Sequence, residues 1–571
     1  MRIGLVFADP FLFIQFMSPI LSNKNLTFLY ALLALVYVSG LFIPLMENDS
    51  AQHATMAMRM YLQNDFIHLF RGFNEYLDKP HMHFWLAALS FKIFGVSHWA
   101  YRIPALLFTI LGAYSSFGLA KELYGKTAGH LAALIFLSAQ AIILANHDVR
   151  TDAVLTGASI FGLWQLASYI NKGYWLNAVL GAVGTAIAFS TKGLLGIFFI
   201  VIPVFCHLLY TRNWKRLWSW KVILGLLVFF LTILPMVYAY YMQFDIHPDK
   251  VVNGQTNVSG IKFIFWDQSF NRLTGSGFES NNKDYFFFFH TMLWAFLPWA
   301  FITYVAIFDR SRQFFKLRLK YMKGMEFLTL GGFWLTMIII NTSKSKLPHY
   351  MNSLFPVLAV LLAGYLVYLL KDKKVKQLKR LLTVQYVIVI LATSLSLILI
   401  FMVFPMPSLP LLLVYLVLFS LLIYALFQKK EYLYKIITVS VLFSVFLNFS
   451  LNTQFYPKLL QYQAGNNMVK IIEDKKIDPE DIYFIEGSHS WTLNFYTERQ
   501  TPEISLSEIK NYHGKWVFVY DKDIEKLKEN DIQWDESFET AHYRITMLSL
   551  PFLNPDTRAS QLRKAYLLKI H

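Results

Sequence analysis

The sequence predicts a polytopic α-helical membrane protein that carries a small α/β domain at its C-terminal end. The chain of 571 residues is 56% hydrophobic and only 15% charged, and its mean hydropathy is +0.42. Soluble globular proteins contain about 25% charged residues, so most of this chain needs the bilayer as its apolar solvent. The single cysteine, Cys206, excludes an internal disulfide and a thiolate metal site.

Apolar runs long enough to cross a membrane, roughly 17–25 residues, occur about thirteen times. We predict spans at residues 27–46, 100–120, 127–146, 153–170, 174–190, 194–211, 222–242, 286–308, 326–341, 349–370, 382–404, 410–427 and 436–451. The first 20 residues are also apolar, but Asp9 and Pro10 interrupt them and no basic segment precedes a cleavage site. We expect them to form a tail that lies on the membrane rather than a signal peptide.

The distribution of charge predicts the orientation of the spans. Residues 455–571 contain 15 basic and 18 acidic side chains, so the basic excess belongs to residues 1–454. There it gathers in short clusters between apolar runs, which is typical of cytoplasmic loops and not of a nucleic-acid groove. Thirteen spans that start from a cytoplasmic N-terminus place all four clusters on the cytoplasmic side, at residues 212–221, 310–323, 371–380 and 429–435.

We therefore expect residues 1–454 to form the transmembrane domain, with two large outer loops at 47–99 and 243–285. Residues 455–571 are expected to form an α/β domain outside the cell membrane. A helical pattern at Tyr462–Lys475 precedes its β-rich runs, which are DIYFIE at 481–486, KWVFVY at 515–520 and YRITMLSL at 543–550.

Ionisable residues gather at the outer ends of the predicted spans, whereas the interiors of the spans are nearly free of charge. They are Glu47, Asp49, Asp148, Arg150, Asp152, Lys344, Lys346 and His349. Because charge is costly in a membrane and is usually retained for function, this convergence on one face predicts a site there. A transporter or flippase would instead place such groups near the bilayer midplane, and a receptor or assembly scaffold would not need Asp49. Taken by itself, the position of Asp49 fits the role of a general base and equally that of a helix cap.

Three ordered blocks of sequence stand at this outer face. The first joins Asp49 and the HATMAMRM helix to DKPHMHFWLAALSFKIFG, the second is TDAVL at 151–155, and the third is SKLPHY at 345–350, followed by Phe355-Pro356. Together they resemble the polyprenyl-phosphate-sugar-dependent glycosyltransferases of the GT-C class. The resemblance covers residues from about 27 to 370. It is nearest to the bacterial aminoarabinose lipid A transferases, and the protein O-mannosyltransferases are more distant.

The resemblance implies a GT-C fold and an inverting transfer of a sugar from undecaprenyl phosphate. The implied acceptor is lipid A or a related envelope glycolipid at the periplasmic face of a bacterial inner membrane, with a protein Ser/Thr acceptor as the alternative. The family usually has Asp-Glu in the first block, where this chain has Asp49-Ser50, and Glu-Lys-Pro, where it has Asp78-Lys79-Pro80. These departures concern the sugar and the acceptor more than the reaction.

By the same resemblance Asp49 and Asp152 are the expected catalytic carboxylates. A departing lipid phosphate needs fixed positive charge and hydrogen-bond donors. The candidates on the outer face are Lys79, Lys346, Arg272 and Tyr350. Each has a structural alternative, because a lysine at a membrane boundary also serves as an interfacial snorkelling residue and Asp152 also suits a helix cap.

Asp78, His81 and His83 combine carboxylate and imidazole groups, the ligand types that a zinc site uses. Some relatives bind a divalent ion near this motif, so a metal at these three residues is one expectation and no cofactor is the other. The sequence has no glycine-rich phosphate loop, and neither a nucleotide nor a nucleic acid is expected as a partner.

Overall fold

The computed structural model describes residues 21–318, 320, 322 and 325–571, except 275–281, and the predicted membrane-surface tail at residues 1–20 lies outside this part. Within it, nine helices, some continued by a 3-10 or π turn, are long and apolar enough to cross a membrane. They are α1 (Asn23–Leu41), α4 (His98–Tyr124), α7 (Asp152–Lys172), α9 (Leu194–Thr211), α10 (Trp220–Tyr240), α16 (Phe355–Lys371), α17 (Val375–Phe401), α18 (Leu409–Phe427) and α19 (Tyr432–Ser450). The chain is a multi-pass membrane protein.

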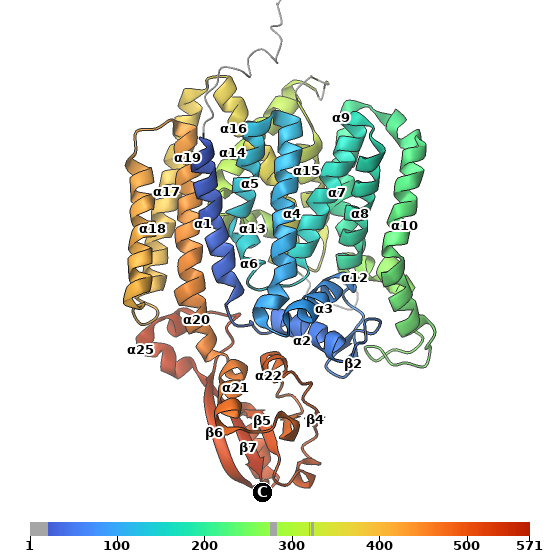
Figure 1. Cartoon of the computed structure of the whole chain (residues 1–571), viewed down its shortest axis with the longest axis vertical. Coiled ribbons are helices and arrows are strands. Elements are labelled where there is room, and N and C mark those ends of the chain that lie inside the picture. The colour runs from blue at the N-terminus through green and yellow to red at the C-terminus, as the bar shows by residue number, and fades with distance from the viewer. Residues whose placement is uncertain (1–20, 275–281, 319, 321, 323–324) are drawn as a thin grey trace, which may run out of the picture.

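The other four predicted spans coincide with helices of the same bundle that are less apolar, shorter or broken (Figure 1). Two of them are α8 (Trp175–Lys192) and α15 (Leu328–Thr342). The spans predicted at 127–146 and 286–308 are each divided in two, into α5 (Lys126–Leu137) with α6 (Gln140–Leu144) and α13 (Phe287–Ala295) with α14 (Ala300–Lys316). Pro298 stands in the second break, where it has no N–H to continue a helix.

A layer of short elements covers one end of the bundle (Figure 1). It contains α2 (Asp49–Leu62), β1 (Phe70–Arg71), β2 (Asn74–Glu75), α3 (Met82–Phe94), α11 (Gly260–Lys262) and α12 (Gln268–Thr274). The amphipathic α2 buries Ala51, Ala54 and Met58. Asp49 is its first residue, where the positive end of the helix dipole favours a carboxylate. The first outer loop is thus a folded layer that presents Asp49 at the bundle end.

The C-terminal region folds around a five-stranded sheet with the order β4-β3-β5-β7-β6. Its strands are β3 (Ile482–Ile485), β4 (Glu503–Ile504), β5 (Trp516–Tyr520), β6 (Trp534–His542) and β7 (Arg563–Ile570). β3 is parallel to β4 and β5, whereas β7 is antiparallel to β5 and β6. The helices are α20 (Tyr456–Leu459), α21 (Ala464–Lys475), α22 (Trp491–Tyr496), α23 (Asp521–Glu529), α24 (Leu550–Leu553) and α25 (Pro555–Arg558). The small α/β domain is confirmed, while helix from α19 runs on through the boundary predicted at residue 454.

The strand predicted at 543–550 is wrong. β6 ends at His542, and the N–H of Tyr543 bonds the carbonyl of Tyr462 at 2.7 Å instead of a neighbouring strand. The Tyr543 ring then stacks on Phe552 of α24, with 3.7 Å between the ring centroids. This segment turns back to the membrane domain, where Phe552 shares an apolar cluster with Phe404.

Candidate functional site

A polar cavity of about 620 Å³ lies between the bundle end and the layer of short elements. Its walls come from α2, the segment before α3, the turn before α7, the end of α8 and the segment after α15, which lie far apart in the sequence. Five of the predicted site residues line it, namely Asp49, Asp78, Lys79, Asp152 and Tyr350. The prediction that distant polar segments converge at one face is confirmed in this geometry.

Asp49 and Arg150 form an ion pair in the wall of this cavity. The Asp49 side chain is 54% exposed, and its Oδ2 lies 3.0 Å from Nη1 of Arg150. Nη2 of the same guanidinium donates to Asp148 Oδ2 at 2.7 Å. Burial opposes the charge of Arg150, but the Asp148 and Asp49 carboxylates outweigh it and raise the pKa of Arg150. Arg150 therefore stays cationic and holds both carboxylates.

Asp152 pairs with a residue that sequence reasoning missed. Lys192 Nζ lies 2.7 Å from Asp152 Oδ1, and the two side chains are only 3% and 5% exposed. Lys192 is the last residue of α8, and Gly193 ends the helix with a φ of 61°. Its ammonium also lies 4.8 Å from the centre of the Tyr350 ring. The available signal was that Lys192 is the one ionisable residue of the turn between two predicted spans.

Lys79 also lines the cavity, from the segment before α3. Its Nζ donates to the carboxylate of its neighbour Asp78. The backbone carbonyl of Asp78 accepts a hydrogen bond of 2.6 Å from Gln268 Nε2, which ties this wall to α12. Lys79 thus lines the polar cavity with its charge paired to Asp78.

One of the predicted phosphate ligands, Lys346, does not line this cavity. Lys346 Nζ donates to the carbonyls of Asn282 and Asp284 at 2.9 Å each. Its ammonium thus braces the backbone before α13, and Lys192 supplies the lysine of this wall instead. Arg272 belongs to α12, and its side chain lies outside the described part of the chain.

The metal site predicted from Asp78, His81 and His83 is corrected by the structure. His81 Nε2 lies 2.8 Å from the carbonyl of Ile67, and His83 Nε2 lies 3.0 Å from the Tyr101 hydroxyl. Residues two apart at a helix start point in different directions, so the three groups do not converge. Burial lowers the pKa of each histidine to about 4, which keeps both neutral. Among the described residues no cluster of three His, Cys, Asp or Glu side chains is placed to hold a metal.

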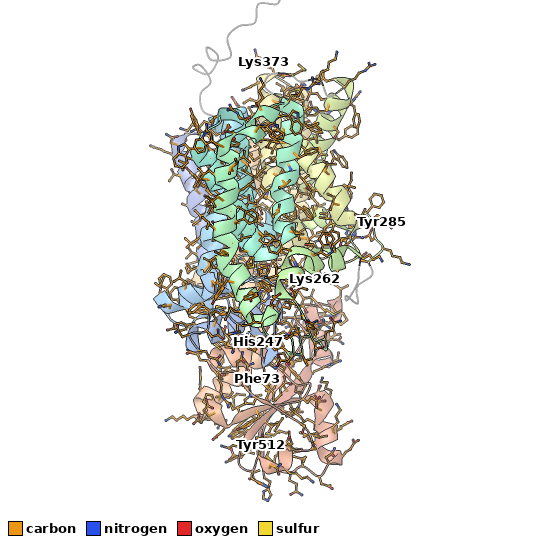
Figure 2. All side chains as sticks on the ribbon, turned by 90° about the vertical axis from the view of Figure 1, so that its right-hand side faces the viewer. Phe73, His247, Lys262, Tyr285, Lys373 and Tyr512 are labelled. Carbon is orange, nitrogen blue, oxygen red and sulfur yellow. The ribbon has the colours of Figure 1, made fainter. Side chains whose placement is uncertain are left out.

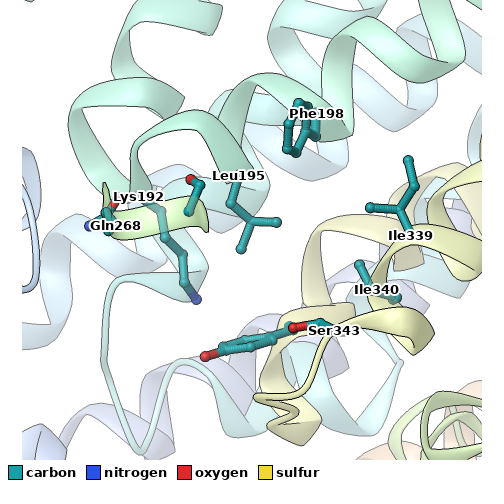
Figure 3. A pocket seen from close by; sticks show the side chains of 9 residues that line it. Lys192, Leu195, Phe198, Gln268, Ile339, Ile340 and Ser343 are labelled. Carbon is teal, nitrogen blue, oxygen red and sulfur yellow. The ribbon is translucent and has the colours of Figure 1, made fainter. Parts of the chain in front are cut away.

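A second, mostly apolar pocket adjoins the polar cavity. Figure 3 shows its lining of Leu195 and Phe198 from α9 and Ile339 and Ile340 from α15, with Lys192 at one side. Lys192 and Tyr350 line both spaces. The two spaces together suit an amphiphile whose charged part lies by Lys192 and whose hydrocarbon part lies between α9 and α15.

Arg102 fixes the two segments that carry the acidic groups. The side chain is fully buried on α4. It donates to the carbonyl of Leu41, the last residue of α1, at 2.9 Å, and to those of Ile43 and of Pro44 (3.2 Å) in the segment between α1 and α2. Its Nε donates to the carbonyl of His147 at 3.0 Å. One guanidinium therefore joins the backbone that precedes Asp49 to the backbone that precedes Asp148.

The chain is similar in sequence and in fold to known proteins. Residues 78–238 match the family model described as dolichyl-phosphate-mannose-protein mannosyltransferase. The undecaprenyl phosphate-α-4-amino-4-deoxy-L-arabinose arabinosyl transferase of Edwardsiella ictaluri is 27% identical over 353 residues, which is 58% of each chain. The enzyme of the same name from Pseudomonas paraeruginosa is 26% identical over 341 residues, 58% of this chain and 57% of the relative. The chain thus matches somewhat more than half the length of these relatives.

The crystal structure of ArnT from Cupriavidus metallidurans bound to undecaprenyl phosphate superposes with a TM-score of 0.72. It is 18% identical, and the match covers 96% of this chain and 98% of that one. In its apo state the same protein gives a TM-score of 0.69 at 17% identity. The chain therefore has the GT-C fold of ArnT and is similar in sequence to the aminoarabinose transferases.

Proposed function

We propose that the chain is an integral-membrane glycosyltransferase that moves a sugar from undecaprenyl phosphate to lipid A or a related envelope glycolipid. The observation that carries this proposal is the junction of two spaces at Lys192 and Tyr350, one polar and lined by both acidic and basic side chains, the other apolar. A polyprenyl phosphate sugar has the same division into a charged head and a hydrocarbon chain. The sequence similarity to aminoarabinose transferases supports the same class of donor.

In this proposal the prenyl chain enters between α9 and α15 and the phosphate lies beside Lys192. An ammonium has three donors, and the hydrogen bond to Asp152 at 2.7 Å leaves donors for a phosphate oxygen. Lys79 and Tyr350 line the same cavity and add a second positive charge and a hydroxyl. Fixed positive charge is needed there because negative charge develops on the phosphate as the glycosidic bond breaks.

Asp49 is proposed to act at the sugar carbon. An acceptor oxygen attacks the anomeric carbon as the bond from that carbon to the phosphate oxygen breaks, and undecaprenyl phosphate leaves with the electron pair. A hydroxyl acceptor gives its proton to Asp49, which is the most accessible carboxylate of the central ion-pair group. A phosphate acceptor is already anionic, and Asp49 then orients the reacting groups. Attack opposite the leaving phosphate inverts the anomeric carbon.

We place this site at the periplasmic face of a bacterial inner membrane, with the N-terminus in the cytoplasm. The support is the position of the basic loops. Figure 2 shows Lys373 at one end of the molecule and Tyr512 of the C-terminal domain at the other. Short loops rich in lysine and arginine stay cytoplasmic, so the end with the cavity and the sheet faces the periplasm.

A protein with a Ser/Thr acceptor is the second candidate. The observation in its favour is the match of residues 78–238 to a protein mannosyltransferase family model. The same chemistry applies, because a serine or threonine hydroxyl also needs a base such as Asp49.

The test is mass spectrometry of lipid A and other envelope glycolipids from four strains. They carry the intact gene, a deletion, Asp49→Asn, or Asp249→Asn, which changes an exposed carboxylate outside the cavity. We expect a sugar-mass increment with the intact gene and with Asp249→Asn, and none in the other two strains. Four identical lipid profiles would contradict the lipid acceptor. Glycoprotein profiles of the same strains then decide the second candidate.

A further inference from the structure

A second polar cavity, of about 530 Å³, lies between the first outer loop and the C-terminal domain. Glu47 and Asn48 line one side of it, and Tyr520, Arg544 and Arg563 line the other. It lies on the far side of the segment before α2 from the proposed donor site, since Asn48 lines this cavity and Asp49 lines the donor cavity. Nothing in the proposed transfer reaction uses it.

The groups that line this cavity give it a positive charge. Arg544 and Arg563 are exposed, and within the described part of the chain neither guanidinium has a hydrogen bond or a salt bridge. Glu47 is the one carboxylate of the lining. It already accepts hydrogen bonds from two groups of the C-terminal domain, Ser490 Oγ at 2.9 Å and the N–H of Thr492 at 2.8 Å. Two free guanidiniums beside a satisfied carboxylate suit an anion, and phosphate matches their planar donor geometry best.

Other charged groups near this cavity do not cancel the two arginines. His489 lines it and lies 3.2 Å from Glu503 through Nδ1, so that carboxylate already has a partner. Asp521, which lies near His542, accepts the backbone N–H of Lys564 at 3.3 Å. The positive charge that faces the cavity therefore comes from Arg544 and Arg563.

The wall that carries Arg544 continues into an apolar segment at the membrane. Ile545 and Met547 line the cavity, Met547 is 62% exposed, and Leu550 is 82% exposed. Phe552 packs in one cluster with Val403 and Phe404, at the outer end of α17. Met402, Met406 and Leu409, at the neighbouring ends of α17 and α18, are also exposed. Since these helix ends lie at the lipid headgroups, the exposed side chains of this segment meet acyl chains.

We propose that this cavity binds the phosphate headgroup of an anionic lipid from the same membrane leaflet. Arg544 and Arg563 hold the phosphate, and Met547 and Leu550 lie against the acyl chains. The bound lipid then fastens the C-terminal domain to the segment that leads into Asp49. The binding step goes beyond the proposed transfer and does not depend on it.

Native mass spectrometry of the purified full chain in detergent tests this site directly. The chain is titrated with phosphatidylglycerol or with phosphatidylcholine of the same acyl chains, and the retained lipid is counted. We expect a preference for phosphatidylglycerol that falls about tenfold in the double variant Arg544→Gln, Arg563→Gln, because charge-assisted hydrogen bonds to the phosphate are lost. The control is Lys510→Gln, Lys528→Gln, which removes two exposed cations of the same domain outside the cavity. Melting temperatures of both double variants report folding.

Three results would overturn the proposal. One is equal retention of the two lipids by the unchanged chain, and another is an equal loss in both double variants. The third result comes from a titration with glycerol phosphate and inorganic phosphate without lipid. If either binds as tightly as phosphatidylglycerol, the occupant is a soluble phosphate compound and not a membrane lipid. If both bind far more weakly and the loss is specific to the arginine variant, the lipid site is supported whether or not sugar transfer is found.

Discussion

Nη1 of Arg150 lies 3.0 Å from Oδ2 of Asp49, so a residue of the turn before α7 holds the first residue of α2. The same guanidinium reaches Asp148 through its other terminal nitrogen. The orientation of the proposed catalytic carboxylate is therefore set from outside its own helix. A single planar side chain links two segments of the bundle end that are far apart in the sequence.

The first prediction concerns this clamp. In Arg150→Lys a single ammonium replaces the planar fork and cannot hold Asp49 and Asp148 in the same geometry. We expect the rate of sugar transfer to fall by roughly 10- to 100-fold, as for a misplaced catalytic group. The measurement is transfer to acceptor lipid in membranes, with Arg499→Lys in the C-terminal domain as the matched control. An unchanged rate in Arg150→Lys would show that Asp49 needs no clamp.

The buried pair of Lys192 and Asp152 leads to the second prediction. Removing one partner leaves an unpaired buried charge, so Lys192→Met or Asp152→Asn alone should destabilise the chain by about 3–5 kcal/mol. The double variant removes both charges and should recover much of that loss in the free energy of unfolding. It should still fail to transfer sugar, because the proposed phosphate contact is gone. Thermal unfolding and transfer assays on the three variants form a double-mutant cycle. Additive losses of stability would contradict the predicted coupling of Lys192 and Asp152.

The third prediction concerns the attachment of the C-terminal domain. Glu47 accepts hydrogen bonds from Ser490, from Thr492 Oγ1 and from the Thr492 N–H, at 2.8 to 3.0 Å. Burial raises the pKa of Glu47, although these donors lower it, so the neutral isostere is expected to be tolerated. Glu47→Ala should cost about 2–3 kcal/mol, while Glu47→Gln should cost less. Faster hydrogen exchange at α22 in Glu47→Ala, and not in Glu47→Gln, is the measurement.

The fourth prediction concerns pH. Burial lowers the pKa of His81 and of His83 to about 4, whereas an unfolded histidine has a pKa of about 6.5. The folded chain binds fewer protons in this window, so stability is highest above about pH 6.5 and falls as the pH drops toward 4. Each histidine contributes on the order of 3 kcal/mol to this fall. Melting temperatures at several pH values should show a flatter fall in His83→Gln than in His247→Gln, and equal slopes would contradict the assignment.

The spans were predictable because the bilayer imposes an apolar length on each one, and this length is readable in single runs of sequence. The breaks within the spans were harder to predict from the sequence. The run at 127–146 gives no local sign that α5 stops at Leu137, where the Ser138 hydroxyl bonds back to the carbonyl of Leu134 at 2.5 Å. The run at 543–550 has the composition of a strand, but the stacking of Tyr543 on Phe552 decides its path. Contacts between distant segments override local preference in both places.

Some residues of the candidate site were also predictable from the sequence, and others were not. Asp49, Lys79 and Asp152 stand in recognisable blocks of sequence, and all three line the polar cavity. Lys192 was missed because a lysine in a short turn resembles an ordinary interfacial residue until its burial against Asp152 is seen. Lys346 is the reverse case. It stands in a recognisable block of sequence, but its ammonium donates to two backbone carbonyls and does not line the cavity.

Arg102 bonds only main-chain oxygens in the segments that it joins. Such bonds do not depend on which side chains those segments carry. In the stretch between α1 and α2, the exposed side chains Phe42 and Asn48 can therefore change while the path is kept, and a new acceptor preference can evolve there without loss of the active geometry. For protein engineering, these two positions are the natural targets of a randomised library, and Arg102 and Glu47 are the residues to leave untouched.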